Sequence, residues 1–119
     1  MPLLSKSDIL APEDMPYEDV DVPEWGGSVR VRVMTGMEKD DWEASIYRMK
    51  SDGVELNQEN FRASLISRTL CDENGPIEFS PTEIIALGAK SSLALDRVFR
   101  AARRINRISK EDQEELTKN

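Results

Sequence analysis

The segment that most constrains the fold of this chain is residues 18–36, which read EDVDVPEWGGSVRVRVMTG. Apolar and polar residues alternate over 19–22 and again over 28–34, a pattern typical of half-buried β-strands. Between them, Gly26-Gly27 can supply the positive φ angles that a tight connection needs. We therefore predict a β-hairpin over residues 17–34. A two-stranded ribbon is only marginally stable alone, so its valine face must lie on helices or on another chain.

Helical signals dominate the rest of the sequence. Capping patterns begin helices at Thr35–Glu38 and, most clearly, at Ser80–Glu83. Turn residues end helices before Gly53 and Gly75, and Gly88 is the expected C-terminal cap of the third helix. We therefore predict helices over about 35–50, 58–71, 81–88 and 90–107. The residues expected on their apolar faces are Met37, Trp42, Ile46 and Met49, then Phe61, Leu65, Ile66 and Leu70, and in the longest helix Leu95, Val98, Phe99, Ala102 and Ile105.

The expected fold is mainly α, with four to five helices and one small N-terminal β-hairpin. A chain of 119 residues is long enough for one domain with a real core. We expect an extended N-terminal arm over 1–16, with room for one short turn at 5–10. A single globular domain follows over 17–108, and a short helix or frayed tail over 109–119.

Composition excludes several classes of protein. The net charge of −7 argues against non-specific binding of nucleic acid or membrane by the whole domain. The sequence has no apolar stretch of about 18 residues, as a transmembrane helix would need. The first ten residues lack the basic and apolar regions of a signal peptide. The single cysteine, Cys71, is interpreted as a small buried hydrophobe, and a reducing cytoplasm fits best.

Charge is unevenly distributed along the chain. Residues 1–60 hold six Lys/Arg and fourteen Asp/Glu, a net of −8, whereas residues 61–119 hold ten and nine, a net of +1. At about 100° per residue, the basic side chains of the last helix fall within an arc of about 120° opposite its core face. These side chains are Arg97, Arg100, Arg103, Arg104 and Arg107, and we call them the arginine stripe.

Two interpretations of the arginine stripe remain open. It is a docking surface for an acidic partner, or it is a solvated helix face. In the second case, Asp96 partly neutralises Arg100 at i, i+4, and the acidic first half of the chain neutralises the rest. Nucleic acid is a weaker third possibility, because the remainder of the chain is acidic and no exposed aromatic residues interleave the stripe.

The sequence offers no clear catalytic chemistry. It contains no histidine, so the commonest general base and metal ligand is absent. No glycine-rich phosphate loop or complete calcium loop occurs. We therefore expect a non-enzymatic protein with no catalytic residue, no cofactor and no metal. Trp25 has two interpretations: an anchor between the hairpin and the helices, or an exposed hot spot in an interface.

The segment DVDVPEWGGSVRVRVMTGMEKDDWEASI resembles the start of tail assembly chaperones of long, non-contractile-tailed (lambda-like, siphovirus) bacteriophages. Weaker matches follow in the expected order and extend the resemblance over about residues 5–108. They are the run CDENG at 71–75, Phe79-Ser80, ALG at 86–88 with KSS at 90–92, and LDRVF at 95–99. The run PEWGG at 23–27 is the most distinctive of these strings.

This resemblance implies a function by binding. Such chaperones bind the tape measure protein, keep it soluble and promote polymerisation of the tail tube around it. A longer, frameshifted form recruits the tail tube protein, and the end at Lys118-Asn119 resembles the short form. The resemblance implies a protein that acts in the host cell cytoplasm and is absent from the mature virion. The uneven charge and the unpaired edges of the hairpin predict a homo-oligomer, with the hairpin or the long helix at the contact. The alternative is an adaptor or regulatory domain that binds an acidic partner or nucleic acid through the arginine-rich helix 90–107. Tentative partner-binding residues are Trp25 and the arginine stripe.

Overall fold

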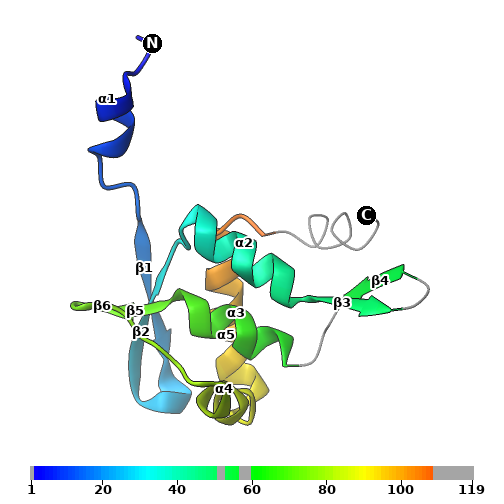
Figure 1. The fold of residues 1–119 in the computed structure, drawn as a ribbon. Coiled ribbons are helices and arrows are strands. Elements are labelled where there is room, and N and C mark those ends of the chain that lie inside the picture. The colour runs from blue at the N-terminus through cyan, green and yellow to red at the C-terminus, as the bar shows by residue number, and fades with distance from the viewer. Residues whose placement is uncertain (1, 51–52, 57–59, 109–119) are drawn as a thin grey trace.

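The computed structural model describes residues 2–50, 53–56 and 60–108 (Figure 1). The described elements are, in chain order, α1 (Lys6–Leu10), β1 (Tyr17–Val22), the 3-10 helix η1 (Pro23–Trp25), β2 (Gly27–Arg32), α2 (Gly36–Ser45), β3 (Tyr47–Lys50), β4 (Gly53–Leu56), α3 (Phe61–Thr69), β5 (Leu70–Asp72), β6 (Gly75–Pro76), α4 (Pro81–Gly88) and α5 (Ser92–Ile105). The predicted helix or tail over 109–119 lies outside the described residues.

The predicted N-terminal hairpin is confirmed. β1 and β2 pair antiparallel, with Val20 opposite Val29 on the face that lies against the core. The connection is η1 followed by Gly26, whose φ of 76° ends the 3-10 turn in the left-handed region that favours glycine. Only the first of the two glycines has this conformation, because Gly27 already belongs to β2.

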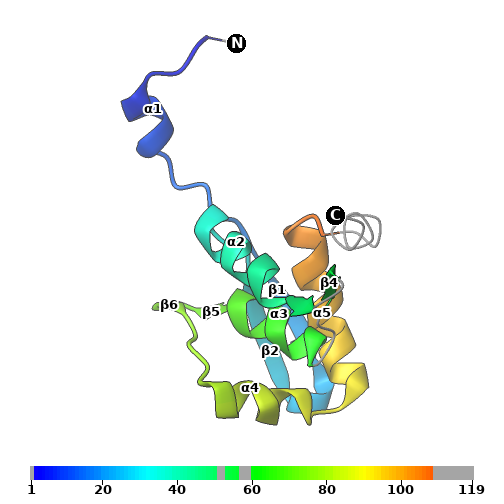
Figure 2. The ribbon, with the colours of Figure 1, turned by 45° about the vertical axis from the view of Figure 1, so that its right-hand side comes forward.

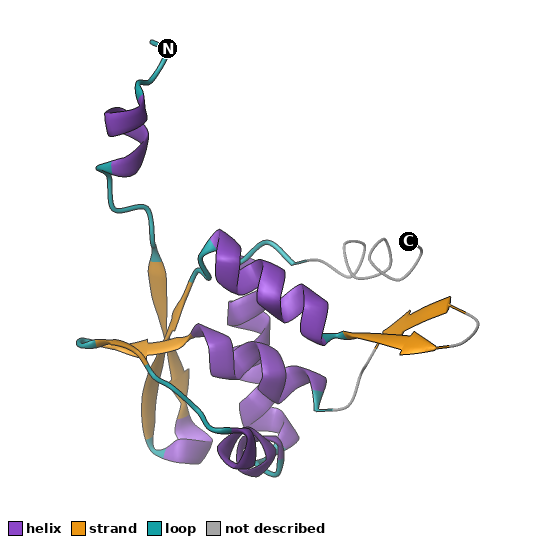
Figure 3. Cartoon of the chain, in the orientation of Figure 1, coloured by secondary structure: helices purple, strands orange, loops and turns teal. Residues whose placement is uncertain are grey.

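The hairpin is half of a larger sheet, so the fold is a mixture of α and β and not mainly α. β5 pairs antiparallel with β2, and β6 pairs antiparallel with β5, which gives the strand order β1-β2-β5-β6. A second, two-stranded sheet is formed by β3 and β4, which project from the end of α2 away from the larger sheet (Figure 3). The part of the prediction that counted four to five helices holds, since the described residues contain five α-helices.

The predicted helix over 35–50 starts correctly but ends early. Thr35 and Glu38 form the expected capping box, and α2 then ends at Ser45, whose hydroxyl donates to the carbonyl oxygen of Trp42 at 2.6 Å. Residues 47–50 form β3 instead. The sequence YRMK followed by GVEL alternates in polarity, and this period of two indicates strands and not a helix.

The apolar stripe predicted for this helix is half right. Trp42 and Ile46 are buried, but Met37 is 83% exposed. Five residues separate Met37 from Trp42, which places them about 140° apart around the helix. Met49 is not among the residues whose side chains the structure describes.

The predicted helix over 58–71 is also shorter in the structure. α3 begins at Phe61 and ends at Thr69, whose hydroxyl hydrogen-bonds to the carbonyl oxygens of Leu65 and Ile66. Leu70 then takes an extended conformation with ψ 137°, and β5 begins there because its backbone pairs with β2. Cys71 therefore lies in a strand, where it is buried as expected.

The core is built around α5. This helix packs against β1 and β2 on one side and against α3 on the other, while α3 also contacts α2 and α4 (Figure 2). Helices therefore cover one face of the four-stranded sheet. The predicted apolar face of α5 is confirmed: Leu95, Val98, Phe99 and Ala102 are buried, and Ile105 is partly buried against the same cluster.

The N-terminal residues stand apart from this core. α1 is a five-residue helix with a capping box between Ser5 and Asp8, at the position of the expected short turn, and it contains no buried residue. A backbone hydrogen bond of 3.1 Å from Val33 to the carbonyl oxygen of Pro16 marks the start of the hairpin. Beyond this point the arm continues away from the domain (Figures 1 and 2).

Candidate interaction surface

The exposed side of α5 carries only part of the predicted arginine stripe. Arg97 and Arg104 are exposed, and both are held by carboxylates from the hairpin. Nε of Arg97 donates to both carboxylate oxygens of Glu24 at 3.0 Å, and Arg104 pairs with Glu18. The acidic first half of the chain therefore neutralises these two arginines, as the solvated-face interpretation expects.

Arg100 lies between these two pairs on the same side of α5. It is exposed and forms no ion pair with any carboxylate in the described ranges. The expected pair between Arg100 and Asp96 is wrong, because Asp96 binds Nε of Arg62 on α3 at 2.8 Å. The close packing of α3 on α5 brings Arg62 to Asp96 and leaves Arg100 to solvent.

The other two members of the stripe, Arg103 and Arg107, lie at the end of α5, where Arg103 is half-buried and Arg107 is exposed. The guanidinium of Arg103 lies 5.5 Å from the ring centroid of Phe99, and its Nε donates to the carbonyl oxygen of Ile108 at 3.1 Å. Arg107 follows the helix and has a φ of 55°. It is thus the left-handed residue that often ends a helix, and glycine is the usual choice there. The stripe on the helix itself ends at Arg104.

Trp25 is partly buried against the core cluster. It is the last residue of η1, and α5 contacts this turn. This position matches the anchor interpretation. Because the adjacent Glu24 binds Arg97, the tip of the hairpin is fixed on α5 by one apolar contact and one ion pair. The pKa of Glu24 is lowered by its own backbone amide and then by Arg97.

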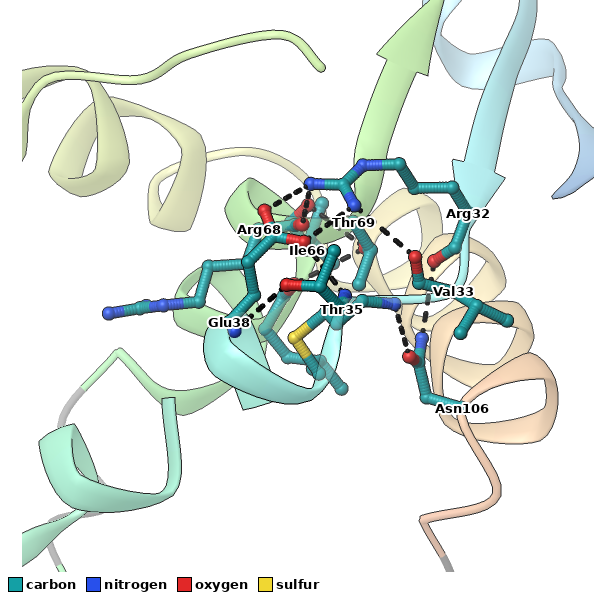
Figure 4. Close-up of polar contacts among 10 residues, drawn as sticks. Arg32, Val33, Thr35, Glu38, Ile66, Arg68, Thr69 and Asn106 are labelled. Atoms are coloured by element: carbon teal, nitrogen blue, oxygen red, sulfur yellow. Dashed lines mark hydrogen bonds and ion pairs between the residues drawn. The ribbon is translucent and has the colours of Figure 1, made fainter. Parts of the chain in front are cut away.

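A polar network that sequence reasoning missed holds the other end of α5 (Figure 4). Arg32 is buried, and its guanidinium donates to Glu38 at 2.8 and 2.6 Å and to the backbone oxygen of Arg68 at 3.2 Å. Asn106, just after α5, accepts from the backbone amide of Met34 at 2.8 Å and donates to the backbone oxygen of Arg32 at 3.3 Å. The network therefore joins β2, α2, α3 and α5.

Within this network, Arg32 strongly favours the ionised form of the Glu38 carboxyl group. The hydrogen bonds from Arg32, together with those from Thr35, lower the pKa of Glu38 from 4.5 to about 2. Nε of Arg32 has no hydrogen-bond partner although it is buried. The alternation of β2 predicted that Arg32 would face away from the valines. Nothing local in the sequence indicates that α2 and α3 cover it there.

The uncovered face of the large sheet holds a shallow groove of about 440 Å³. Arg30 crosses this face, binds Asp19 through Nε at 2.8 Å and lies 4.2 Å from the ring centroid of Tyr17. Cys71 is among the residues that line the groove, and burial raises the pKa of its thiol. Arg30 neutralises Asp19, whereas Asp72 and Glu73 leave the lining of the groove net acidic.

Neither a metal centre nor a membrane-spanning helix is found in the described residues. They contain no group of three or more Cys, Asp or Glu residues that could hold a metal ion. None of their helices is both long and apolar enough to cross a bilayer.

Comparisons with known proteins identify one fold. No family model matches the sequence, and no curated protein matches it. Among solved structures, the tail assembly chaperone of bacteriophage HK97 matches with a TM-score of 0.50 and 18% sequence identity. The match covers 79% of this chain and 85% of the HK97 chain. At this identity the likeness is one of fold, and it agrees with the resemblance seen in the sequence. The chain therefore has the fold of a phage tail assembly chaperone.

Proposed function

We propose that this protein is a tail assembly chaperone of a long-tailed bacteriophage, which acts by binding and not by catalysis. The observation that carries this proposal is the fold shared with the HK97 chaperone over most of both chains. The segment around PEWGG, which first suggested the family, forms β1, η1 and β2 at the edge of the large sheet. Fold and local sequence therefore support the same function independently.

The proposed partner is the tape measure protein, which the chaperone keeps soluble while the tail tube polymerises around it. A long helical protein that is not yet enclosed by its tube exposes apolar and charged side chains. A chaperone that binds these side chains reversibly would prevent the protein from aggregating. Among the exposed arginines on α5 itself, Arg100 is the best placed for such a contact, because Glu18 and Glu24 already bind its neighbours Arg104 and Arg97. The net charge of −7 keeps the chaperone itself soluble.

Co-expression with the tape measure protein of the same phage tests this function. We expect the soluble fraction of the tape measure protein to rise when the wild-type chain is present and to rise less with Arg100→Glu. Arg62→Glu is the matched control, because Arg62 is also exposed but lies on α3 and binds Asp96. A tape measure protein that stays insoluble with the wild-type chain, although both proteins are expressed, would contradict the proposal.

An adaptor or regulatory domain acting through the same helix is the alternative function. Neutralisation of Arg97 and Arg104 by the hairpin reduces the positive charge available to nucleic acid, which argues against that partner. Salt-dependent binding of an unrelated DNA duplex by the wild-type chain, lost in Arg100→Glu, would favour the alternative.

We further propose that the protein acts in the host cytoplasm, is absent from finished virions, and contacts the tail tube protein through a longer frameshifted form. Mass spectrometry of infected cells and of purified virions tests these points. Detection of this chain in the virions at the level of a structural tail protein would contradict its role as an assembly factor.

A further inference from the structure

The N-terminal arm has apolar side chains that nothing in the described chain covers. All of residues 2–17 are exposed. Leu3, Leu4, Ile9 and Leu10 are each 61–100% exposed, although they occur within eight consecutive residues. Monomeric proteins rarely present so dense a group of large apolar side chains to water, and such groups mark interaction sites.

The arm also contains a short helix, α1, whose N-terminus is already capped. The hydroxyl of Ser5 accepts from the backbone amide of Asp8 at 3.3 Å, and the carboxylate of Asp8 accepts from the amide of Ser5 at 3.0 Å. A helix of five residues is too short to be stable alone. Its capping box lowers the entropy cost of ordering it against another surface.

The direction of the arm points to another molecule. Its last attachment is the hydrogen bond between Pro16 and Val33, and it leaves the domain beyond the start of β1 (Figures 1 and 2). The pair between Glu18 and Arg104 places this exit beside the C-terminal end of α5. α4 and the start of α5 lie at the opposite end of the domain, away from the arm of the same chain.

That opposite end carries a complementary surface. Ile85 on α4 and Leu93 on α5 are each 69% exposed. The turn between the two helices is tight, with a backbone hydrogen bond of 3.1 Å from Lys90 to Leu87. Lys90 is exposed at this turn and Arg100 is exposed two turns after Leu93 on α5, against the exposed Glu83 on α4, so these three residues sum to +1. The arm carries three acidic residues, Asp8, Glu13 and Asp14, against Lys6.

We propose that the arm of one copy docks on the α4–α5 end of a second copy. Ile9 and Leu10 lie against Ile85 and Leu93 in this contact, and opposite charges set its orientation. The two surfaces are different and lie at opposite ends of one chain, so the contact is head-to-tail. This inference needs no phage partner, so its failure would leave the proposed chaperone function untouched.

Sedimentation velocity on the full-length chain tests the proposal. We expect the wild-type chain to self-associate with rising concentration. The arm variant Ile9→Glu/Leu10→Glu and the acceptor variant Ile85→Glu/Leu93→Glu are each expected to weaken this by at least about tenfold, which corresponds to the loss of one good apolar contact. Met37→Glu is the control, because Met37 is 83% exposed but lies on α2. Circular dichroism confirms that each variant is folded.

A mixture of the two variants gives the decisive result. The arm variant keeps its acceptor surface and the acceptor variant keeps its arm, so an equimolar mixture has one intact contact and forms a dimer that cannot grow further. Self-association that survives in either variant would overturn the proposal. A wild-type chain that stays monomeric would also overturn it, and would assign the arm to its own domain or to a different partner.

Discussion

Arg32 and Glu38 form a two-pronged ion pair, with hydrogen bonds of 2.8 and 2.6 Å between the guanidinium and the carboxylate. The arginine side chain is 11% exposed and the glutamate 36%. The same carboxylate accepts from the amide of Thr35 at 2.8 Å and so also caps α2. One side chain therefore caps the start of α2 and neutralises the buried charge at the junction of β2, α2 and α3.

Loss of the Glu38 charge is expected to destabilise the domain. Glu38→Gln leaves Arg32 buried without its counter-ion, which should lower the free energy of unfolding by about 2 kcal/mol. Urea denaturation followed by circular dichroism measures this change. Asp40→Asn removes a charge from the exposed side of α2 and is the control, with an expected change within about 0.5 kcal/mol. Equal stability of both variants would show that the pair contributes nothing.

The same pair predicts a loss of stability in acid. The pKa of Glu38 is about 2 in the folded protein against 4.5 ordinarily, so the unfolded chain binds a proton first as the pH falls. The contribution of this group is complete above pH 4.5 and disappears as the pH approaches 2. Wild type should therefore lose more stability over this range than Glu38→Gln. Parallel curves of unfolding free energy against pH for the two proteins would contradict the assignment.

Gly88 is predicted to be required for packing. A Cβ at this position would lie 2.8 Å from Cγ of Asn60 and closer still to its Oδ1, while the amide nitrogen of Asn60 donates to the carbonyl oxygen of Ile84 at 3.0 Å. Gly88→Ala should cost about 2 kcal/mol despite the better helix propensity of alanine.

Two variants isolate this contact. Asn60 has a φ of 53°, a left-handed conformation that glycine adopts without strain. Asn60→Gly therefore keeps this conformation and removes the side chain that a Cβ on residue 88 would meet. The double variant should recover part of the loss, which a double-mutant cycle measures. Gly36→Ala is the control, because a Cβ there meets no atom within 4 Å. Additive effects of the two substitutions would exclude a direct clash.

Arg107→Gly is expected to stabilise the domain. The left-handed φ of 55° after α5 costs most residues about 1 kcal/mol relative to glycine. Arg107→Ala removes the same charge but keeps the unfavourable backbone, and should not stabilise. The melting temperatures of the two variants separate backbone from charge. A higher melting temperature for both would indicate that repulsion among the arginines, and not φ, is the cause.

Local signals in the sequence predicted much of the fold. The capping boxes at Thr35 and Ser80 begin α2 and α4 as expected. The hairpin and the apolar face of α5 also follow, because alternation and helical spacing are properties of neighbouring residues. The strand β5 was missed because three residues pair only through the distant β2. The arginine stripe was only partly right, because the partners of Arg97 and Arg104 lie 73 and 86 residues away in the sequence.

The sequence by itself determined the hairpin, the helix starts, the acidic character of the chain and its resemblance to tail assembly chaperones. Only the tertiary structure decided which charges are available to a partner. It buries Arg32 on Glu38, binds Arg97 and Arg104 to the hairpin, and leaves Arg100 and the apolar arm exposed. The physical reason is the separation along the sequence between the residues that interact. Caps and alternation act over three or four residues, whereas burial and ion pairing depend on which distant elements pack together.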